Sequence, residues 1–511
     1  MIAFPDEERA NVVATGSAGV AGVTGRAAVL GTPVYPRGRP TERRQGRGPA
    51  LPGGLLDPVR QGSHLLNRCV FIAAHEAGNL SFYPTYRRLV KNQWRKFDAL
   101  QSDQDRQLRH MVDFAYRNVL YYHRLFNRLR LKPDDFRTIR DLEKLPLLNK
   151  EIINRCPDDF KPQYLSRIKF SRAATGGTTG VPLEYRLSSY DRFLGGALLY
   201  RGWGYAGFRL GDPMVFLAGA SLDIGTRSAL VTRAHEVARN LKKLSSFDMG
   251  DREMADYARV VNAFRPRFIR GYASSLYFFA SWLERHDVRV HSPAGVFTTS
   301  EKLYPAMRVK IAETFDCPVF DTYGLDDGGV AAFECKEHAG KHIDMERSVM
   351  EVVDGDGRQV EDGEGRIIAT SLHNYAMPFL RYDTGDEGHV TSEPCACGRG
   401  YKVLKDVNGR TVDVLITPEG RNIHGWFFLY IFWEMRGVRE YQVVQESLER
   451  IVIKIVRDES FDERQLDRIR QVVRSRSEGW DLDIRFVDAI ERTGSGKYKF
   501  IKNDYIKNLN A

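Results

Sequence analysis

The sequence predicts an α/β fold with a large N-terminal domain and a small C-terminal α+β domain. Short apolar segments alternate with helical segments through the middle of the chain, and this pattern changes near residue 410. The chain has 511 residues, which is enough for several domains and a large core. Because 42% of the residues are hydrophobic and 28% are charged, the composition excludes wholesale disorder.

Residues 1–79 are predicted to be a poorly ordered extension. They contain nine Arg and no Lys, and the first lysine of the chain is Lys91. Gly, Ala, Pro and Arg dominate this region without a sustained helical or strand period. Such a tail is either a dispensable extension or a segment that contacts RNA or acidic lipid.

Residues 80–410 form the predicted large domain. Apolar residues recur at helical spacing across residues 107–120, which predicts a helix there. Strands and helices then alternate, as is typical of parallel α/β layers. The predicted strands are 213–217, 268–269 and 295–298, and the predicted helices between them are 254–264 and 276–285.

Residues 411–511 form the predicted small domain. Strands are predicted at 443–445, 451–456 and 482–487, with an amphipathic helix at 462–475. A unit of about 100 residues is large enough to act as a mobile lid. The aromatic run at 426–433 is either a partner surface or buried packing at the hinge between the domains.

The charge balance favours anionic partners. The chain carries 76 Lys and Arg against 66 Asp and Glu, which gives a formal net charge of +10. No basic block is both long and interleaved with aromatic residues, and this argues against nucleic acid. The longest apolar run, at 426–433, is far shorter than the roughly 20 residues of a membrane-spanning helix. An acidic start unlike a secretory signal, together with only six cysteines, favours a cytoplasmic location.

A loop rich in glycine and threonine is the most informative motif. Its residues are Thr175, Gly176, Gly177, Thr178, Thr179 and Gly180. Glycines let the backbone approach a ligand closely, and N–H groups and hydroxyls can donate to a triphosphate. It is not a Walker A motif, because Val181 stands where that motif needs a lysine. By itself, such a loop is also consistent with an ordinary surface turn.

Five segments, in order, resemble the motifs of the adenylate-forming superfamily, which includes the acyl-CoA synthetases. They are TGGTTGVPL at 175–183, TYGLDDGG at 322–329, MPFLRYDTGDEG at 377–388, NGRTVDVL at 408–415 and RTGSGKYKF at 492–500. Residues 108–153, with NVLYYHRLF and DLEKLPLLNKEII, resemble the phenylacetate–CoA ligase branch and its capsule-biosynthesis relatives. The resemblance covers about residues 85–505.

The resemblance implies an AMP-forming acid–thiol ligase. Such enzymes use ATP and Mg²⁺ to convert a carboxylic acid into an acyl-adenylate, and then pass the acyl group to a thiol, usually that of CoA. Two alternatives remain open. The acyl group could pass to a carrier protein, an amine or a sugar in polysaccharide biosynthesis, or the chain could be a non-catalytic nucleotide-binding relative.

The resemblance also assigns ATP contacts outside the loop. The implied residues are Ser300, Glu301, Tyr323, Gly324, Asp326, Asp386 and Arg410. Tyr323 would stack on adenine, and Asp386 would accept hydrogen bonds from the ribose hydroxyls, to which Arg410 would donate. Without the flanking motifs, Tyr323 would be an ordinary core residue and Asp386 a turn former.

Lys497 resembles the mobile catalytic lysine of the family, and Lys499 is the second candidate. Its ammonium would stabilise the negative charge that builds up during adenylation, and its Gly-rich loop would let it withdraw afterwards. Asp327 stands where the family usually has the glutamate that holds Mg²⁺. Because aspartate is one methylene shorter, it would bind the ion directly or through water.

A cysteine and histidine pattern predicts a structural Zn²⁺ site. Cys335 and His338 form a C-x-x-H pair, and Cys395 and Cys397 form a C-x-C pair. Three thiolates and one imidazole suit tetrahedral zinc. His342 could replace His338 as the nitrogen ligand. The alternative is four unrelated reduced side chains, because C-x-C is shorter than the usual C-x-x-C spacing.

Overall fold

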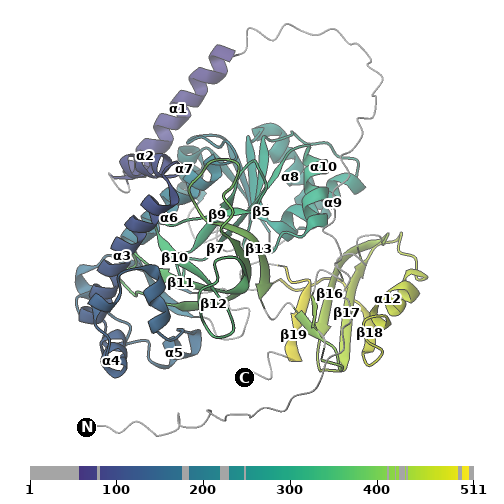
Figure 1. Ribbon diagram of the computed structural model, residues 1–511. Coiled ribbons are helices and arrows are strands. Elements are labelled where there is room, and N and C mark those ends of the chain that lie inside the picture. Colours follow the sequence, from purple (N-terminus) through teal and green to yellow (C-terminus); the bar gives the residue numbers. More distant parts are fainter. Residues whose placement is uncertain are drawn as a thin grey trace. The chain divides into compact units, whose positions relative to one another are not determined.

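The computed structural model describes most of the chain from residue 57 onward (Figure 1). The described ranges are 57–77, 81–174, 183–218, 229–246, 249–410, 414–420, 422–424, 428, 432, 435–492 and 498–505. The chain divides into two units, Met1–Leu56 and Asp57–Ala511, and every described residue belongs to the second unit.

Helices form the N-terminal part of the second unit. They are α1 (Asp57–Glu76), α2 (Phe82–Asn92), α3 (Phe97–Asn118), α4 (Leu120–Leu129) and α5 (Lys150–Arg155), with 3-10 turns at Pro133–Asp135, Ile139–Lys144 and Leu165–Arg167. α3 confirms the helix predicted across residues 107–120 as far as Asn118, and Val119 has an extended backbone that separates α3 from α4. Leu108, Met111, Val112 and Ala115 form the buried face of α3, as their helical spacing requires.

α1 corrects the predicted boundary of the poorly ordered extension, because this helix lies within residues 1–79. Its Phe71 is buried, and its ring packs edge-on against Tyr200 with centroids 5.1 Å apart. Phe82 of α2 also packs against Phe71, with ring centroids 6.5 Å apart. Aromatic burial therefore orders a helix that the Gly- and Arg-rich composition of the preceding residues conceals. Residues 1–56 lie outside the described part of the chain.

The central sheet contains eleven of the described strands, in the order β10-β11-β12-β13-β9-β8-β7-β6-β5-β3-β4. Its parallel part consists of β3 (Met214–Ala218), β4 (Leu241–Ser245), β5 (Phe268–Tyr272), β6 (Gly295–Thr299) and β7 (Val319–Gly324). The intervening helices are α8 (Asp251–Phe264), α9 (Ala273–Arg285) and α10 (Pro305–Phe315). Leu276, Ile311 and Val296 share one buried core between these layers, which confirms the predicted parallel α/β arrangement.

The sheet becomes antiparallel beyond β7, a change that the alternation of strands and helices does not predict. These strands are β8 (Ala331–Glu334), β9 (Lys341–Ile343), β10 (Ser348–Val353), β11 (Gly363–Ser371), β12 (Tyr382–Thr391) and β13 (Val403–Arg410). A separate antiparallel pair, β1 (Phe170–Ala174) and β2 (Glu184–Ser188), precedes α6 (Ser189–Gly204) and α7 (Ala229–Arg239). Within the central sheet, β7 therefore has a parallel neighbour on one side and an antiparallel neighbour on the other.

The C-terminal region has a sheet of its own, in the order β18-β17-β16-β19. Its elements are β16 (Val438–Gln445), β17 (Arg450–Arg457), α12 (Gln465–Arg474), β18 (Asp481–Phe486) and β19 (Ile501–Asn503), and the hairpin β14 (Val414–Ile416) and β15 (Asn422–His424) precedes them. The strands and the amphipathic helix agree with the predicted elements. Phe428 and Phe432 of the aromatic run are buried, and Phe432 stacks on Tyr441 at 3.9 Å, which favours packing over a partner surface at these two positions.

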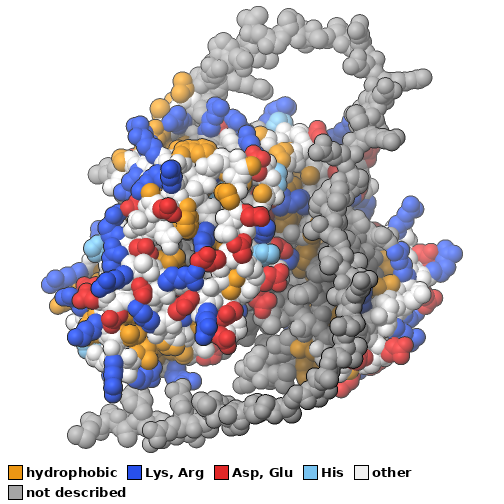
Figure 2. Space-filling view, viewed as in Figure 1, with side chains coloured by type: hydrophobic (Ala, Val, Ile, Leu, Met, Phe, Trp, Pro, Cys, Tyr) orange, Lys and Arg blue, Asp and Glu red, His pale blue; other side chains and the backbone are white. Residues whose placement is uncertain are grey.

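Figure 2 shows Lys and Arg side chains interspersed with Asp and Glu on the visible face. The excess of positive charge is therefore not gathered into one basic area on that face. Among the described helices, none is both long enough and apolar enough to cross a lipid bilayer.

Candidate functional site

Several predicted ATP-binding residues lie at the carboxyl ends of the parallel strands β6 and β7. Ser300 and Glu301 directly follow β6, and Tyr323 and Gly324 end β7. The carboxyl ends of parallel strands meet at the same edge, and ligands of open α/β sheets bind there. Ser300 has a φ of 66°, a left-handed conformation that is uncommon outside glycine and is concentrated at functional sites.

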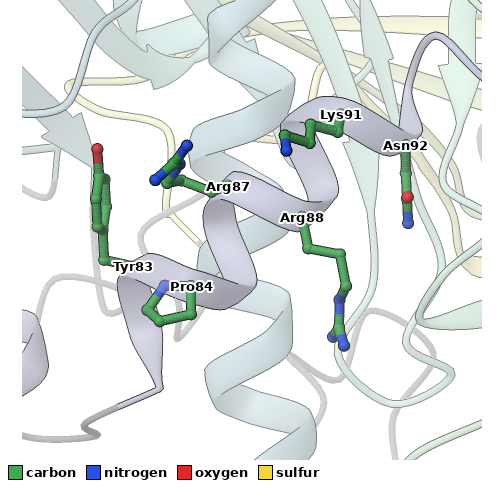
Figure 3. Close-up of a pocket in the computed structure, with 6 residues that line it drawn as sticks. All are labelled: Tyr83, Pro84, Arg87, Arg88, Lys91 and Asn92. Carbon is green, nitrogen blue, oxygen red and sulfur yellow. The ribbon is translucent and has the colours of Figure 1, made fainter.

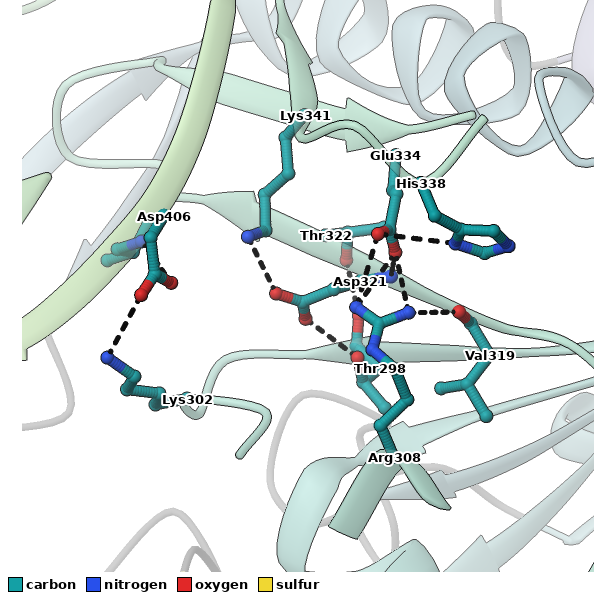
Figure 4. A network of polar contacts seen from close by, with 11 residues as sticks. Thr298, Lys302, Arg308, Val319, Asp321, Thr322, Glu334, His338, Lys341 and Asp406 are labelled. Carbon is teal, nitrogen blue, oxygen red and sulfur yellow. Dashed lines mark hydrogen bonds and ion pairs between the residues drawn. The ribbon is translucent and has the colours of Figure 1, made fainter. Parts of the chain in front are cut away.

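A polar network inside the sheet fixes β6 against β7 (Figure 4). Thr298 Oγ1 donates to Asp321 Oδ1 at 2.7 Å, and Thr322 Oγ1 donates to the Thr298 carbonyl at 2.6 Å. Lys341 Nζ pairs with Asp321 Oδ2 at 2.9 Å. All four residues are buried, so these contacts satisfy groups that would otherwise be costly to desolvate. The network therefore holds the two strand ends in a fixed relation.

Glu334 is the second centre of this network (Figure 4). Its carboxylate accepts the Asp321 backbone N–H at 2.6 Å and pairs with Arg308 at 3.1 Å. His338 Nδ1 lies 3.3 Å from Glu334 Oε1. Burial acts to raise the pKa of Glu334, but the hydrogen bond from His338 and the charge of Arg308 hold it below its usual value. His338, the predicted zinc ligand, therefore contacts the buried carboxylate of Glu334.

Tyr323 and Asp386 are in contact across the sheet. Tyr323 OH donates to Asp386 Oδ2 at 3.0 Å. Desolvation and the adjacent Asp386 charge raise the pKa of Tyr323 well above its usual value, so the phenol stays a neutral donor. Asp386 lies on β12, and its backbone partner on β13 is Arg410, whose side chain is outside the described part. A side-chain hydrogen bond joins the predicted adenine residue Tyr323 to Asp386, and backbone pairing joins Asp386 to the second predicted ribose residue, Arg410.

Asp326 and Asp327 follow β7 but have different surroundings. Asp326 is exposed and pairs with Arg347 Nη2 at 3.2 Å. Asp327 is buried, and its Oδ2 accepts a hydrogen bond from Tyr382 OH at 2.9 Å. Carboxylate oxygens are the protein ligands that Mg²⁺ prefers. Asp327 fits this role better than Asp326, whose charge is already neutralised by an arginine.

The predicted phosphate loop, residues 175–180, lies outside the described residues. The strands that flank it, β1 and β2, form a hairpin whose last backbone pair is Ala174 with Glu184. Desolvation raises the pKa of Tyr185 on β2, and the charges of Asp326 and Asp327 add to this effect. The strand that leaves the loop therefore adjoins the acidic pair after β7.

Glu301 links the sheet edge to the segment that contains Lys497, which is itself outside the described residues. Glu301 Oε2 accepts the Ser274 N–H at 2.9 Å, in the first turn of α9. Its Oε1 accepts the Tyr498 N–H at 3.2 Å. The Tyr498 ring packs edge-on against Phe278, with centroids 4.8 Å apart. The residue that follows Lys497 is thus held at the edge that carries the predicted ATP contacts.

A second cluster contains three cysteines and a histidine. The ligand atoms of Cys335, His342, Cys395 and Cys397 all lie within 4.8 Å of one another. Cys335 follows β8, His342 lies on β9, and the other two lie between β12 and β13. Burial lowers the pKa of His342 to about 4, so the imidazole is neutral. The structure therefore brings the alternative ligand His342 to the sulfurs and places His338 elsewhere.

A shallow basic pocket on α2 has a volume of about 480 Å³ (Figure 3). Its lining residues are Tyr83, Pro84, Arg87, Arg88, Lys91 and Asn92. None of the predicted site residues lines it. The pocket is therefore separate from the sheet edge described above.

Sequence reasoning did not identify three residues that support the candidate site. Arg347 joins Asp326 to the buried Asp191, and Tyr382 donates to Asp327. Tyr382 lies within the MPFLRYDTGDEG segment, so the motif could have indicated it. No comparable motif marks Arg347 or Asp191.

Comparisons with known proteins show what this chain is similar to. Residues 415–504 match the family model described as the CapK C-terminal domain. A phenylacetate-coenzyme A ligase of Thermus thermophilus is 28% identical over 341 residues, which cover 64% of this chain and 74% of that protein. The enzyme of the same name from Escherichia coli is 29% identical over 334 residues, which cover 62% and 73% of the two chains.

Solved structures share the fold. A 2-hydroxyisobutyryl-CoA ligase in the postadenylation state, in complex with R3-HIB-AMP, superposes with a TM-score of 0.66 at 19% identity, covering 82% of this chain and 93% of that chain. The same ligase with 2-HIB-AMP and CoA in the thioesterification state gives a TM-score of 0.56 at 20% identity, with the same coverage. These likenesses confirm the predicted fold class. The chain is therefore similar in sequence to phenylacetate-coenzyme A ligases, has the fold of a CoA ligase, and matches the CapK C-terminal domain over residues 415–504.

Proposed function

We propose that this chain is an AMP-forming ligase that activates a carboxylic acid with ATP and transfers the acyl group to CoA. The observation that carries the proposal is the contact of Tyr323, at the end of β7, with Asp386 of β12, while Glu301 directly follows β6, the parallel neighbour of β7. The curated relatives, which are phenylacetate-coenzyme A ligases, support the same chemistry. The cytoplasm stays the predicted location.

In this proposal the described residues bind and orient the nucleotide. Tyr323 presents a neutral aromatic ring to adenine, and the Asp386 carboxylate accepts hydrogen bonds from the ribose hydroxyls. Asp386 has two oxygens, and the one that accepts the Tyr323 hydroxyl keeps the two side chains together. Gly324 allows the end of β7 to lie close to the backbone at Val330, since a Cβ there would lie only 3.3 Å from the Val330 carbonyl oxygen.

Charge stabilisation is assigned to the phosphate loop, Lys497 and Asp327. Adenylation builds negative charge on the α-phosphate and the attacking carboxylate, and preorganised cations and N–H donors lower its free energy. A bound Mg²⁺ ion would neutralise phosphate oxygens, and Asp327 would hold it directly or through water. Glu301 accepts the backbone N–H of Tyr498, the residue that directly follows Lys497, and this contact supports the assignment of the lysine to the same site.

The products formed from ATP, CoA and a carboxylic acid test this function. A panel that contains phenylacetate and 2-hydroxyisobutyrate is expected to include an acid that yields AMP, pyrophosphate and an acyl-CoA, detected by mass spectrometry. ADP with phosphate, or ATP cleavage that is independent of any acid, would contradict the proposal. Acyl-adenylate without acyl-CoA would instead favour a carrier protein, an amine or a sugar as acceptor.

Replacing Asp327 with asparagine is expected to weaken the apparent Mg²⁺ affinity of the adenylation step by about 10–100-fold. The charge of this buried carboxylate would be lost, while its hydrogen bond from Tyr382 could still form. The measurement is the initial rate as a function of Mg²⁺ concentration at saturating ATP. Asp326→Asn is the matched control and should have a smaller effect, because Arg347 already neutralises that exposed carboxylate. Equal Mg²⁺ dependence of Asp327→Asn and the unmodified protein would remove Asp327 from the metal site.

A further inference from the structure

We propose that Cys335, His342, Cys395 and Cys397 bind one structural Zn²⁺ ion. Three thiolates and one imidazole form a typical tetrahedral zinc set, and four protein ligands leave no open position for a substrate. This proposal is independent of the ligase activity, because none of the four residues belongs to the candidate nucleotide site.

The distances in the cluster match those of a tetrahedral zinc ion. Two sulfurs bound to one ion at about 2.3 Å lie about 3.8 Å apart when the angle is tetrahedral. The Sγ atoms of Cys335 and Cys395 are 3.8 Å apart. A sulfur and an imidazole nitrogen on the same ion lie about 3.6 Å apart. Cys397 Sγ and His342 Nε2 are 3.3 Å apart, and all four ligand atoms lie within 4.8 Å of one another.

The imidazole of His342 presents one ring nitrogen to the cysteine cluster. Its Nε2 faces the Cys397 sulfur, while its Nδ1 is buried and has no hydrogen-bond partner among the described residues. The Tyr205 ring packs edge-on at 5.6 Å, and the Tyr401 ring lies 6.5 Å away. Because a buried imidazole gains little from a thiol alone, a metal bond at Nε2 would supply the strong contact that the ring otherwise lacks.

The ion would join two connections that are distant in the sequence. Cys335 and His342 flank the turn between β8 and β9, and the other two cysteines lie in the connection between β12 and β13. β9 and β13 are already neighbours, since His342 pairs with Val403. β12 carries Asp386. A zinc ion would therefore brace the strands that present the predicted ribose residues.

A disulfide between Cys335 and Cys395 is the competing state. It would require the sulfurs to move from 3.8 Å to about 2.05 Å apart. It would also leave Cys397 and His342 facing each other without a third partner. The zinc site uses all four side chains, whereas the disulfide explains only two of them.

Metal analysis of the full chain tests the site. Protein purified in reducing buffer without chelators is expected to contain one zinc ion per chain, as measured by inductively coupled plasma mass spectrometry. His342→Ala should lose the zinc and His338→Ala should keep it, which is a matched comparison of the two candidate histidines. Cys335→Ser should lose the zinc, whereas Cys317→Ser should keep it, because Cys317 lies outside the cluster.

A second measurement uses the unmodified protein and does not depend on the folding of the variants. Replacement of zinc by Co²⁺ should give the visible bands of a tetrahedral ion together with intense sulfur-to-cobalt charge transfer. The proposal would be overturned by folded, metal-free protein that binds no Co²⁺, or by a Cys335–Cys395 disulfide under reducing conditions. Zinc retained by His342→Ala and lost by His338→Ala would also overturn it.

Discussion

Replacing Lys497 with alanine is expected to lower the rate of carboxylate-dependent adenylation by about 10²–10³-fold, the usual cost of removing one preorganised donor from a developing charge. The neighbouring residue shows how the lysine would be held. The Tyr498 N–H donates to Glu301 at 3.2 Å, and its hydroxyl accepts the Tyr441 N–H at 2.9 Å. Tyr498, beside Lys497, is thus held by two hydrogen bonds, and the substitution removes the lysine side chain beyond Cβ, including its ammonium.

The second half-reaction should be affected less. If the lysine withdraws after adenylation, as the resemblance implies, thioester formation from a supplied acyl-adenylate and CoA should proceed within a few-fold of the normal rate. Both half-reactions are measured separately in Lys497→Ala and in Lys499→Ala. Lys499 is the matched control, since it is the nearest lysine in the same segment. An unimpaired Lys497→Ala with an inactive Lys499→Ala would assign the catalytic role to the other lysine.

Replacing Arg347 with methionine is expected to lower the free energy of unfolding by about 3–5 kcal/mol, because it leaves a buried carboxylate without its partner. Arg347 Nη2 pairs with Asp191 at 2.8 Å, and the two side chains are 6% and 2% exposed. Gly195 makes room for the guanidinium, since a Cβ at that position would lie 2.9 Å from its Cζ. Methionine fills a similar space but has no charge for Asp191.

Urea denaturation of the Arg347→Met variant measures this cost. The matched control is Arg366→Met, because the Arg366–Asp383 pair has a similar length of 2.9 Å but an arginine that is 40% exposed. The control should lose no more than about 1 kcal/mol. Adding Asp191→Asn to Arg347→Met should recover part of the loss, because the uncompensated charge is then removed. Equal destabilisation by the two arginine variants would contradict a special role for the buried pair.

The parallel half of the sheet could be predicted from the sequence because its signals are local. The strand at 213–217 and the helix at 254–264 are each recognisable from a short window of residues, and both occur in the structure. The antiparallel half depends on pairings between distant strands, which a local pattern does not encode. α1 was concealed for another reason, since its order depends on tertiary burial of Phe71 and not on composition.

The site was predictable only as far as the motifs reach. They indicate Tyr323 and Asp386 separately, but their hydrogen bond requires β7 and β12 to be placed in one sheet. Spacing favoured His338 as the zinc ligand because it lies close to Cys335 in sequence. The structure favours His342, because β9 pairs with β13 beside the other two cysteines. The buried carboxylate that engages His338 is a tertiary feature with no local signature.

The most direct test of the proposed chemistry is the exchange of labelled pyrophosphate into ATP in the presence of a carboxylic acid and the absence of CoA. A reversible adenylation site should incorporate label only when the correct acid is present, and Lys497→Ala should abolish this incorporation. Incorporation that is independent of the acid, or none with any acid that the protein converts to a thioester, would contradict acyl-adenylate formation at the edge formed by Glu301, Tyr323 and Asp386.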